Sequence, residues 1–386
     1  LEAIGGSITL SYGVTNTIAA TIVAGLLLFL TGIPISRYAS RYGVDIDLLT
    51  RGAGFGYIGS TVTSLVYATF TFILFAIEAS IMSTALQVCF GVPLWLGYVI
   101  SAVVVIPLVT HGMTRISRFQ IITQPLWIIL NILPVGFIAM QDWSAFPAWL
   151  AFPGSHGGEP GFDLLKFGAA ASVILALMPQ IGEQVDVLRF LPPERAARRR
   201  GRIAAMLAGP GWVILGAPKL LFGSFLAVLA LRHGVPAEHA AEPAQMYRIA
   251  FGYVIPWDDF VLLLTAAFVV VSQLKINVMN AYAGSLAWSN FFSRLTHSHP
   301  GRVVWLVFNV AIALVLMELG IYTALEKTLS FFSVVAVAWL GTIVADLVIN
   351  KPLGLSPAGI EFKRAHLYDV NPVGIGSMAI AGIVAL

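Results

Sequence analysis

The feature that most constrains this chain is a series of apolar runs, each about as long as a bilayer is thick. A helix needs roughly 20 mainly apolar residues to cross the hydrocarbon core of a membrane. Such runs recur along the whole sequence, and charged residues make up only 11% of its 386 positions. A soluble domain carries about 25% charged residues, so this chain has too little polar material to cover a water-facing surface. We therefore predict an integral membrane protein built of α-helices.

The apolar runs predict nine complete spanning helices and two partial ones. The complete spans are expected at 15–35, 57–86, 93–110, 119–140, 165–190, 204–231, 258–287, 303–321 and 326–349. Partial spans are expected at 1–12 and 372–386, because Leu1 and Leu386 both lie inside apolar stretches. We expect the chain to be a fragment that is cut within one helix at each end.

The basic residues indicate how the helices are oriented. Most of the 22 Lys and Arg residues fall in every second connection between the predicted spans. These connections are 36–51, 111–118, 189–202, 294–302 and 351–364. Cytoplasmic loops carry an excess of Lys and Arg, so we expect these five loops to be cytoplasmic and the protein to lie in the cell membrane. A miscounted helix would have scattered the charges over both sides, so the pattern also supports the number of spans.

Two segments interrupt the apolar pattern of the first and sixth predicted spans. They are Ile4-Gly5-Gly6-Ser7 and Met178-Pro179-Gln180-Ile181-Gly182. Proline removes a backbone N–H group and glycine frees the backbone, and interrupted helices place free backbone groups at the solute site of many transporters. The two segments lie five spans apart, where two inverted repeats of five helices would place matching breaks. For each of the two segments, the alternative is a helix kink that serves only the packing of the helices.

Ionisable residues inside a membrane helix are costly and mark candidate functional sites. Four stand out, namely Glu78, Glu183, Lys219 and Lys275. We expect Glu78 and Lys275 to line a central cavity, where a buried structural ion pair is the alternative. We expect Lys219 to snorkel or to cap a polar contact, because it follows a proline. Glu183 is expected either in the cavity or, with Asp186, as an ordinary charge at the helix end.

Nothing in the sequence predicts an enzyme, a metal site or a cofactor. The single cysteine, Cys89, excludes an internal disulfide, and the histidines fall in the connections without the spacing of metal ligands. The glycine-rich stretch 52–56 follows no predicted strand, so the sequence does not predict a dinucleotide-binding site there. The net charge of +3 reflects the basic loops, and we expect no nucleic-acid partner.

Several segments of the chain, taken in order, resemble the nucleobase–cation symporter family of purine, cytosine, allantoin and hydantoin permeases. They are Arg51 with Phe55-Gly56-Tyr57-Ile58-Gly59-Ser60, then Asp186-Val187-Leu188-Arg189, then 341–346, and Leu367-Tyr368-Asp369. The resemblance implies the five-plus-five inverted-repeat fold of the leucine-transporter type, which works by alternating access. It places one transporter domain over 1–386, with a first repeat at about 1–140, a second at about 165–349, and the start of an extra helix at 372–386.

The resemblance and the two interruptions together assign a candidate site. Solute-binding residues are expected to be Gly5, Gly6, Glu78, Met178, Gln180 and Asn277, and ion-coupling residues Ser7, Ser272 and Lys275. The family often stacks its solute between two aromatic side chains, but Leu74 and Leu177 occupy those positions here, which weakens the case for an aromatic nucleobase. Lys275 lies beside the implied sodium site, where a fixed ammonium would replace the ion electrostatically. Sodium and protons are both candidate coupling ions.

We predict a secondary active transporter, of the permease or symporter type, for a nucleobase-like or other small nitrogenous solute. Its expected partners are that small polar solute and the lipid bilayer. The alternative is a transporter-like membrane sensor domain of a larger signalling protein, such as a sensor kinase. The sequence sets neither the identity of the solute nor the oligomeric state.

Overall fold

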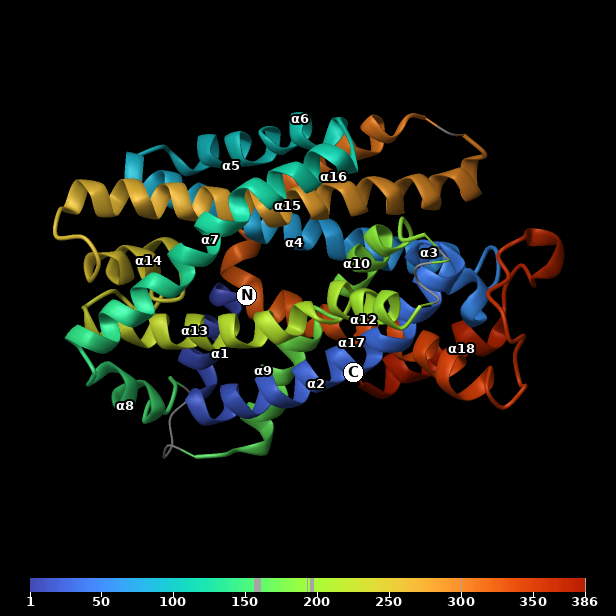
Figure 1. Ribbon diagram of the computed structural model, residues 1–386, viewed down its shortest axis with the longest axis horizontal. Coiled ribbons are helices and arrows are strands. Elements are labelled where there is room, and N and C mark those ends of the chain that lie inside the picture. Colours follow the sequence, from blue (N-terminus) through green and yellow to red (C-terminus); the bar gives the residue numbers. More distant parts are fainter. Residues whose placement is uncertain (156–160, 193, 195–197, 299, 386) are drawn as a thin grey trace.

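Figure 1 shows a computed structural model of the chain, which describes residues 1–155, 161–192, 194, 198–298 and 300–385. Leu386, at the end of the predicted span 372–386, lies outside the described residues. So do residues 193 and 195–197 of the predicted basic loop 189–202 and residue 299 of the loop 294–302.

The described residues fold into a bundle of helices whose long members run along the long axis of the molecule (Figure 1). The first half comprises α1 (Glu2–Tyr12), α2 (Val14–Tyr42), α3 (Ile46–Thr50), α4 (Ser60–Phe90), α5 (Leu94–Val103), α6 (Val105–Thr110), α7 (Met113–Gln141) and α8 (Ala145–Leu150). The second half comprises α9 (Leu164–Leu175), α10 (Gln180–Leu188), α12 (Arg199–Ala208), α13 (Trp212–Arg232), α14 (Pro243–Gly252), α15 (Asp258–Thr296), α16 (Arg302–Glu318), α17 (Leu325–Ala345) and α18 (Pro372–Ala385). Short helical turns at Arg51–Phe55, Ile321–Ala324, Asp346–Asn350 and Arg364–His366 complete the set.

Within the described residues, seven helical stretches are long and apolar enough to cross a bilayer. They are Val14–Tyr42, Ser60–Phe90, Met113–Gln141, Leu164–Leu188, Arg199–Arg232, Asp258–Thr296 and Ile321–Asn350. Each contains or overlaps a span predicted from the sequence. The two other predicted complete spans, at 93–110 and 303–321, form the shorter helical segment Leu94–Thr110 and the 17-residue α16. A helix of 17 residues is about 26 Å long, slightly less than the hydrocarbon core of a typical bilayer.

The residues of α2 show why this segment is a membrane helix. One face packs into the protein through small side chains such as Ala20 and Ala24, which are fully buried. The other face exposes Ile22, Leu26 and Leu30, each to more than half of its surface. Exposed aliphatic side chains on a helix with so few charges are suited to lipid rather than to water.

The predicted break at Ile4-Gly5-Gly6-Ser7 is wrong, because all four residues lie inside the regular helix α1. The glycines serve close packing instead. A methyl group at Gly5 would overlap the carbonyl group of Leu220, and one at Gly223 would overlap the backbone of Glu2. The backbones of α1 and α13 therefore approach so closely that no side chain fits between them, as small residues allow in membrane helices.

The predicted break in the sixth span is confirmed, and it lies between Leu175, where α9 ends, and Gln180, where α10 begins. The chain does not unwind completely there. The N–H groups of Met178, Gln180 and Ile181 donate to carbonyl oxygens three residues back, as in a 3₁₀ turn. Pro179 has no N–H group to donate, so the regular helical hydrogen-bond pattern is interrupted at this point.

Candidate functional site

A cavity of about 460 Å³ lies inside the bundle, between α1, α4, α7, α10, α13 and α15. We call it the central cavity. Its wall carries many polar side chains for a site between membrane helices. They are Glu2, Glu78, Gln120, Gln124, Gln180, Glu183, Gln184, Lys219, Ser272, Gln273 and Lys275. The aromatic rings of Trp127 and Trp212 also line it.

Three oxygen-bearing side chains of the central cavity have acceptor atoms that no protein donor satisfies. Oε1 of Glu183 and Oε1 of Gln273 are buried and have no hydrogen-bond partner among the described residues. Glu78, on α4, also makes no hydrogen bond or ion pair with the described part of the chain. Buried polar atoms are nearly always hydrogen-bonded in folded proteins, so the free acceptors of Glu183 and Gln273 are available to a donor group of a solute, to a water molecule or to a cation.

Lys219 lies in the central cavity and does not snorkel toward the end of its helix. Its Nζ is 3.6 Å from Oε1 of Glu2 and 4.2 Å from the centre of the Trp127 ring. Glu2 also accepts a hydrogen bond of 2.5 Å from the hydroxyl group of Tyr247, whose oxygen lies 3.2 Å from Oδ1 of Asn131. Tyr247 belongs to α14 and is fully buried. The loop helix α14 is therefore connected directly to the charged residues of the cavity.

Lys275 joins α15 to α7 through neutral partners only. Its Nζ donates to the carbonyl oxygen of Gln120 and to the hydroxyl group of Thr123, both at 3.0 Å. In return, Nε2 of Gln120 donates to the carbonyl oxygen of Lys275 at 2.6 Å. One turn away, Nε1 of Trp127 donates to the hydroxyl group of Ser272 at 2.9 Å. The ammonium group thus has no described carboxylate partner, and its charge remains available to the cavity.

Of the nine residues predicted for the site, the structure brings four together in the central cavity: Glu78, Gln180, Ser272 and Lys275. The other five are Gly5, Gly6, Ser7, Met178 and Asn277, and they do not line it. Asn277 is buried between α15 and α4, where it donates to the carbonyl oxygen of Phe75 at 3.4 Å. Ser7 donates to Glu326 of α17, which also accepts from Ser11 at 2.8 Å, so Ser7 faces a different cavity from Ser272 and Lys275.

Sequence reasoning missed the aromatic and amide residues of the cavity. Leu74 and Leu177 occupy the positions at which the family resemblance implies an aromatic pair, and both are buried outside the cavity. The rings come instead from Trp127 of α7 and Trp212 of α13. The glutamines at 120 and 124 could have predicted this wall of the cavity. Polar residues four apart lie on one face of a membrane helix, and they are costly there unless that face meets a polar space.

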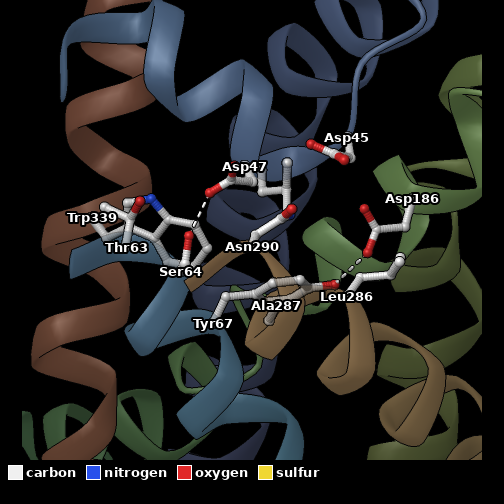
Figure 2. A pocket seen from close by; sticks show the side chains of 11 residues that line it. Asp45, Asp47, Thr63, Ser64, Tyr67, Asp186, Leu286, Ala287, Asn290 and Trp339 are labelled. Atoms are coloured by element: carbon white, nitrogen blue, oxygen red, sulfur yellow. Dashed lines mark hydrogen bonds between the residues drawn. The ribbon is translucent and has the colours of Figure 1, made fainter. Parts of the chain in front are cut away.

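A second polar site lies near α3, around a cavity of about 10 Å³, which is room for about one water molecule (Figure 2). We call the residues Asp45, Asp47, Ser64, Tyr67, Asp186, Arg189 and Arg294 the α3 cluster. Figure 2 shows Asp47 and Asp186 on opposite sides of this space. Asp47 accepts hydrogen bonds from Ser64 and Arg294, while the hydroxyl group of Tyr67 donates to Asp186 at 3.1 Å.

The α3 cluster fastens α10 to its neighbours. Nη1 of Arg189, just after α10, lies 3.1 Å from Oδ2 of Asp45. Burial raises the pKa of the Asp45 carboxyl, and the nearby charge of Asp47 adds to this effect, whereas the Leu48 N–H group and Arg189 act in the opposite direction. Since Tyr67 lies on α4 and Asp186 on α10, the hydrogen bond between them and the Arg189–Asp45 pair close the bundle at this end.

At the opposite end, near α14, a cavity of about 1160 Å³ is lined by α1, α17 and the segment 238–242. Nδ1 of His239 lies 2.8 Å from Oε1 of Glu242, and this contact raises the pKa of the His239 imidazole. Oε1 of Glu238 lies 3.6 Å from the other ring nitrogen. The cavity is therefore a polar vestibule next to the loop helix that contacts the central cavity through Tyr247.

No protein-family model matches the chain, and no curated protein sequence matches it. Solved structures do match over its whole length. One is Mhp1, a nucleobase-cation-symport-1 family transporter in a closed conformation with bromovinylhydantoin bound, with a TM-score of 0.68 and 17% identity over 100% of this chain and 88% of that chain. Another is MhsT in complex with L-phenylalanine, with a TM-score of 0.61 and 15% identity over 100% and 96% of the two chains.

A third match is a Na⁺-coupled sialic acid symporter in a substrate-bound outward-open state, with a TM-score of 0.59 and 15% identity over 100% of this chain and 85% of that chain. The chain therefore has the helix-bundle fold of the leucine-transporter type, and it is a multi-pass membrane protein. The fold class predicted from the sequence is confirmed. The likeness to Mhp1 agrees with the family resemblance at the level of the fold.

Proposed function

We propose that the protein is a secondary active transporter that carries a small nitrogenous solute across the membrane by alternating access. The observation that carries the proposal is that the central cavity holds two buried acceptor oxygens without a partner among the described residues, on Glu183 and Gln273, together with the carboxylate of Glu78. A nucleobase, a hydantoin or a ureide presents several N–H donors on a small rigid frame, and such donors complement these oxygens. The fold supports the proposal, since its neighbours include symporters with small solutes bound.

In this proposal, Glu78 and Glu183 accept N–H groups of the solute, and Gln180 orients Glu183 by donating a hydrogen bond to it. Trp127 and Trp212 supply the apolar faces of the site in place of the aromatic pair that Leu74 and Leu177 cannot provide. Gly5, Gly6, Met178 and Asn277 act indirectly, by fixing how the helices around the cavity pack. The two predicted repeats, about 1–140 and 165–349, are the units that we propose to move against each other, with 372–386 as the start of an additional helix.

We also propose that Lys275 supplies the positive charge which a coupling sodium ion would otherwise supply. It shares a helical face with Ser272, and both side chains contact α7. A cation that is covalently fixed here disfavours a second cation at the Ser272 hydroxyl group. Ser7, which pairs with Glu326 in the vestibule, takes no part in this site.

The basic loops give the proposed sidedness. If the loops 36–51, 111–118, 189–202, 294–302 and 351–364 are cytoplasmic, then the α3 cluster closes the cytoplasmic end of the bundle and the α14 vestibule opens outward. The Arg189–Asp45 and Tyr67–Asp186 contacts would then have to separate when solute is released into the cell.

The proposal is tested by measuring ligand binding to the purified full chain with hydantoin, allantoin, uracil and cytosine, each compared with an analogue methylated on its ring nitrogens. We expect binding of at least one parent compound and a loss of affinity on N-methylation. Glu78→Gln should weaken binding about 10-fold, because a charge-assisted hydrogen bond contributes about 1.5–3 kcal/mol. Glu318→Gln, the same change at an exposed residue of α16, is the matched control. Equal binding by the wild type and Glu78→Gln would contradict the proposed site.

A further inference from the structure

A pocket of about 640 Å³ lies between the end of α2 and α12, outside the central cavity and the α3 cluster. Four arginines line it. Arg37 and Arg41 come from α2, and Arg199 and Arg202 come from α12. The two helices are packed against each other there, since a methyl group at Gly209 would overlap the side chain of Ser36. The pocket is therefore bounded by two fixed helices.

The four arginines have no carboxylate partner in the described part of the chain, whereas Arg51, Arg189 and Arg294 near α3 each have one. Arg51 and Arg294 pair with Asp47, and Arg189 pairs with Asp45. None of the four pocket arginines forms an ion pair or a side-chain hydrogen bond with any residue in the described ranges. All four are exposed. Four uncompensated positive charges around one pocket produce a strong local attraction for an anion.

A fifth polar side chain of the pocket, that of Ser36, also lacks a hydrogen-bond partner among the described residues. Ser36 is 1% exposed, and its Oγ atom makes no hydrogen bond with a described residue. A buried hydroxyl group without a partner is uncommon in a folded protein, because its desolvation is not compensated. Its position in the wall of a pocket of arginines indicates a missing acceptor, such as a phosphate oxygen.

The arginines continue an apolar strip on the surface of α2. Residues 22, 26, 30, 33, 37 and 41 recur at spacings of three and four, so they share one face of the helix. The first four are Ile, Leu, Leu and Ile, and the last two are the pocket arginines. On the other wall, Ile203 of α12 is about half exposed. The pocket is thus apolar on the side of the membrane and cationic at its edge.

From this arrangement we propose that the pocket binds an anionic membrane phospholipid. The phosphate lies between the arginines of α2 and those of α12, where it also satisfies the hydroxyl group of Ser36. One acyl chain lies along the apolar strip of α2. Guanidinium groups bind phosphate oxygens through paired hydrogen bonds, and basic pockets between membrane helices are suited to anionic head groups. The inference depends on the membrane fold and not on which solute the protein carries.

The test is the thermal stability of the purified full chain in a mild detergent, titrated with dioleoyl phosphatidylglycerol or with dioleoyl phosphatidylcholine. We expect phosphatidylglycerol to raise the Tm in a saturable manner and phosphatidylcholine to have little effect. The double variant Arg37→Gln/Arg202→Gln should weaken the lipid response roughly 30-fold, which corresponds to about 1 kcal/mol for each arginine. Arg115→Gln/Arg118→Gln, with the same change of charge in another basic loop, is the matched control and should respond like the wild type.

Two additional titrations distinguish a bound phospholipid from a bound phosphate ion and from the loss of a structural side chain. Inorganic phosphate, titrated alone, should leave the Tm unchanged, because it cannot occupy the apolar strip. The variant Arg37→Lys/Arg202→Lys keeps the charge and should restore most of the response if the glutamine variant loses it. The proposal is overturned if both lipids act equally, if the two glutamine variants lose the response equally, or if phosphate alone reproduces the effect.

Discussion

The charge of Lys275 yields the most specific prediction about coupling. Replacing it by methionine keeps a long, flexible side chain of similar length and removes the ammonium group. Lys275 and Ser272 are three residues apart on α15, so they are separated by about 4.5 Å along the helix axis. Their partners on α7, Thr123 and Trp127, are four residues apart, about 6 Å along that helix, so a sodium ion at the Ser272 hydroxyl group would lie on the order of 6 Å from the ammonium group of Lys275.

Two unit positive charges about 6 Å apart repel each other by about 3 kcal/mol at an effective dielectric constant near 20. Because about 1.4 kcal/mol corresponds to a factor of ten, the ammonium group should weaken sodium binding on the order of a hundredfold. We expect the wild type to show little response to sodium, and Lys275→Met to bind sodium on the order of a hundredfold more tightly.

The assay is the Tm of the purified full chain in sodium chloride and in an equal concentration of choline chloride, followed by binding of radioactive sodium. Sodium should raise the Tm of Lys275→Met and leave the wild type nearly unchanged. Lys327→Met is the control, because it removes the same charge from an exposed residue near the start of α17. A wild type that binds sodium as tightly as Lys275→Met would refute the reasoning.

Three further predictions concern stability, each measured as a change in Tm. Glu242 raises the pKa of His239, so the contact between them stabilises the fold at a pH below the ordinary histidine pKa of about 6.5. This stabilisation disappears as the pH rises through the raised pKa. His239→Gln should therefore have a lower Tm than the wild type in acid and the same Tm in base. Arg294→Met should lower the free energy of unfolding by about 3 kcal/mol, because the buried Asp47 carboxylate loses one of its cations. Adding Asp47→Asn should recover part of this loss. If the losses of the two substitutions simply add, the pairing is contradicted. Gly223→Ala should force α1 and α13 apart and lower the Tm, whereas Gly136→Ala, at an open position in α7, should not.

The membrane spans could be predicted because length and composition leave few alternatives for an apolar run. The seven long stretches follow from the sequence, and so does the interruption between α9 and α10 at Pro179, since proline removes a donor wherever it stands. Glycine is more ambiguous. At Gly5 the same residue type that opens a helix elsewhere instead allows two helices to touch, and only the position of Leu220 distinguishes the two roles.

Site residues could be predicted where a polar side chain in a membrane helix has no polar surroundings other than a cavity. Glu78 and Lys275 are in the central cavity for that reason. Asn277 shows the limit of this argument, because a backbone carbonyl group on a neighbouring helix satisfies it without any cavity. Lys219 was expected to snorkel or to cap a polar contact, and it makes a polar contact inside the cavity. Its partner Glu2 lies more than 200 positions away in the sequence, and no local pattern predicts that contact.

The central claim is that the chain moves a nitrogenous solute across a membrane, and uptake into proteoliposomes tests it most directly. The purified chain would be reconstituted and offered radiolabelled hydantoin, allantoin, uracil and cytosine, with empty liposomes and Glu78→Ala as controls. We predict saturable uptake of at least one compound, independent of sodium, and its loss in Glu78→Ala. Tight, Glu78-dependent binding without any uptake would contradict transport and would favour the membrane-sensor interpretation.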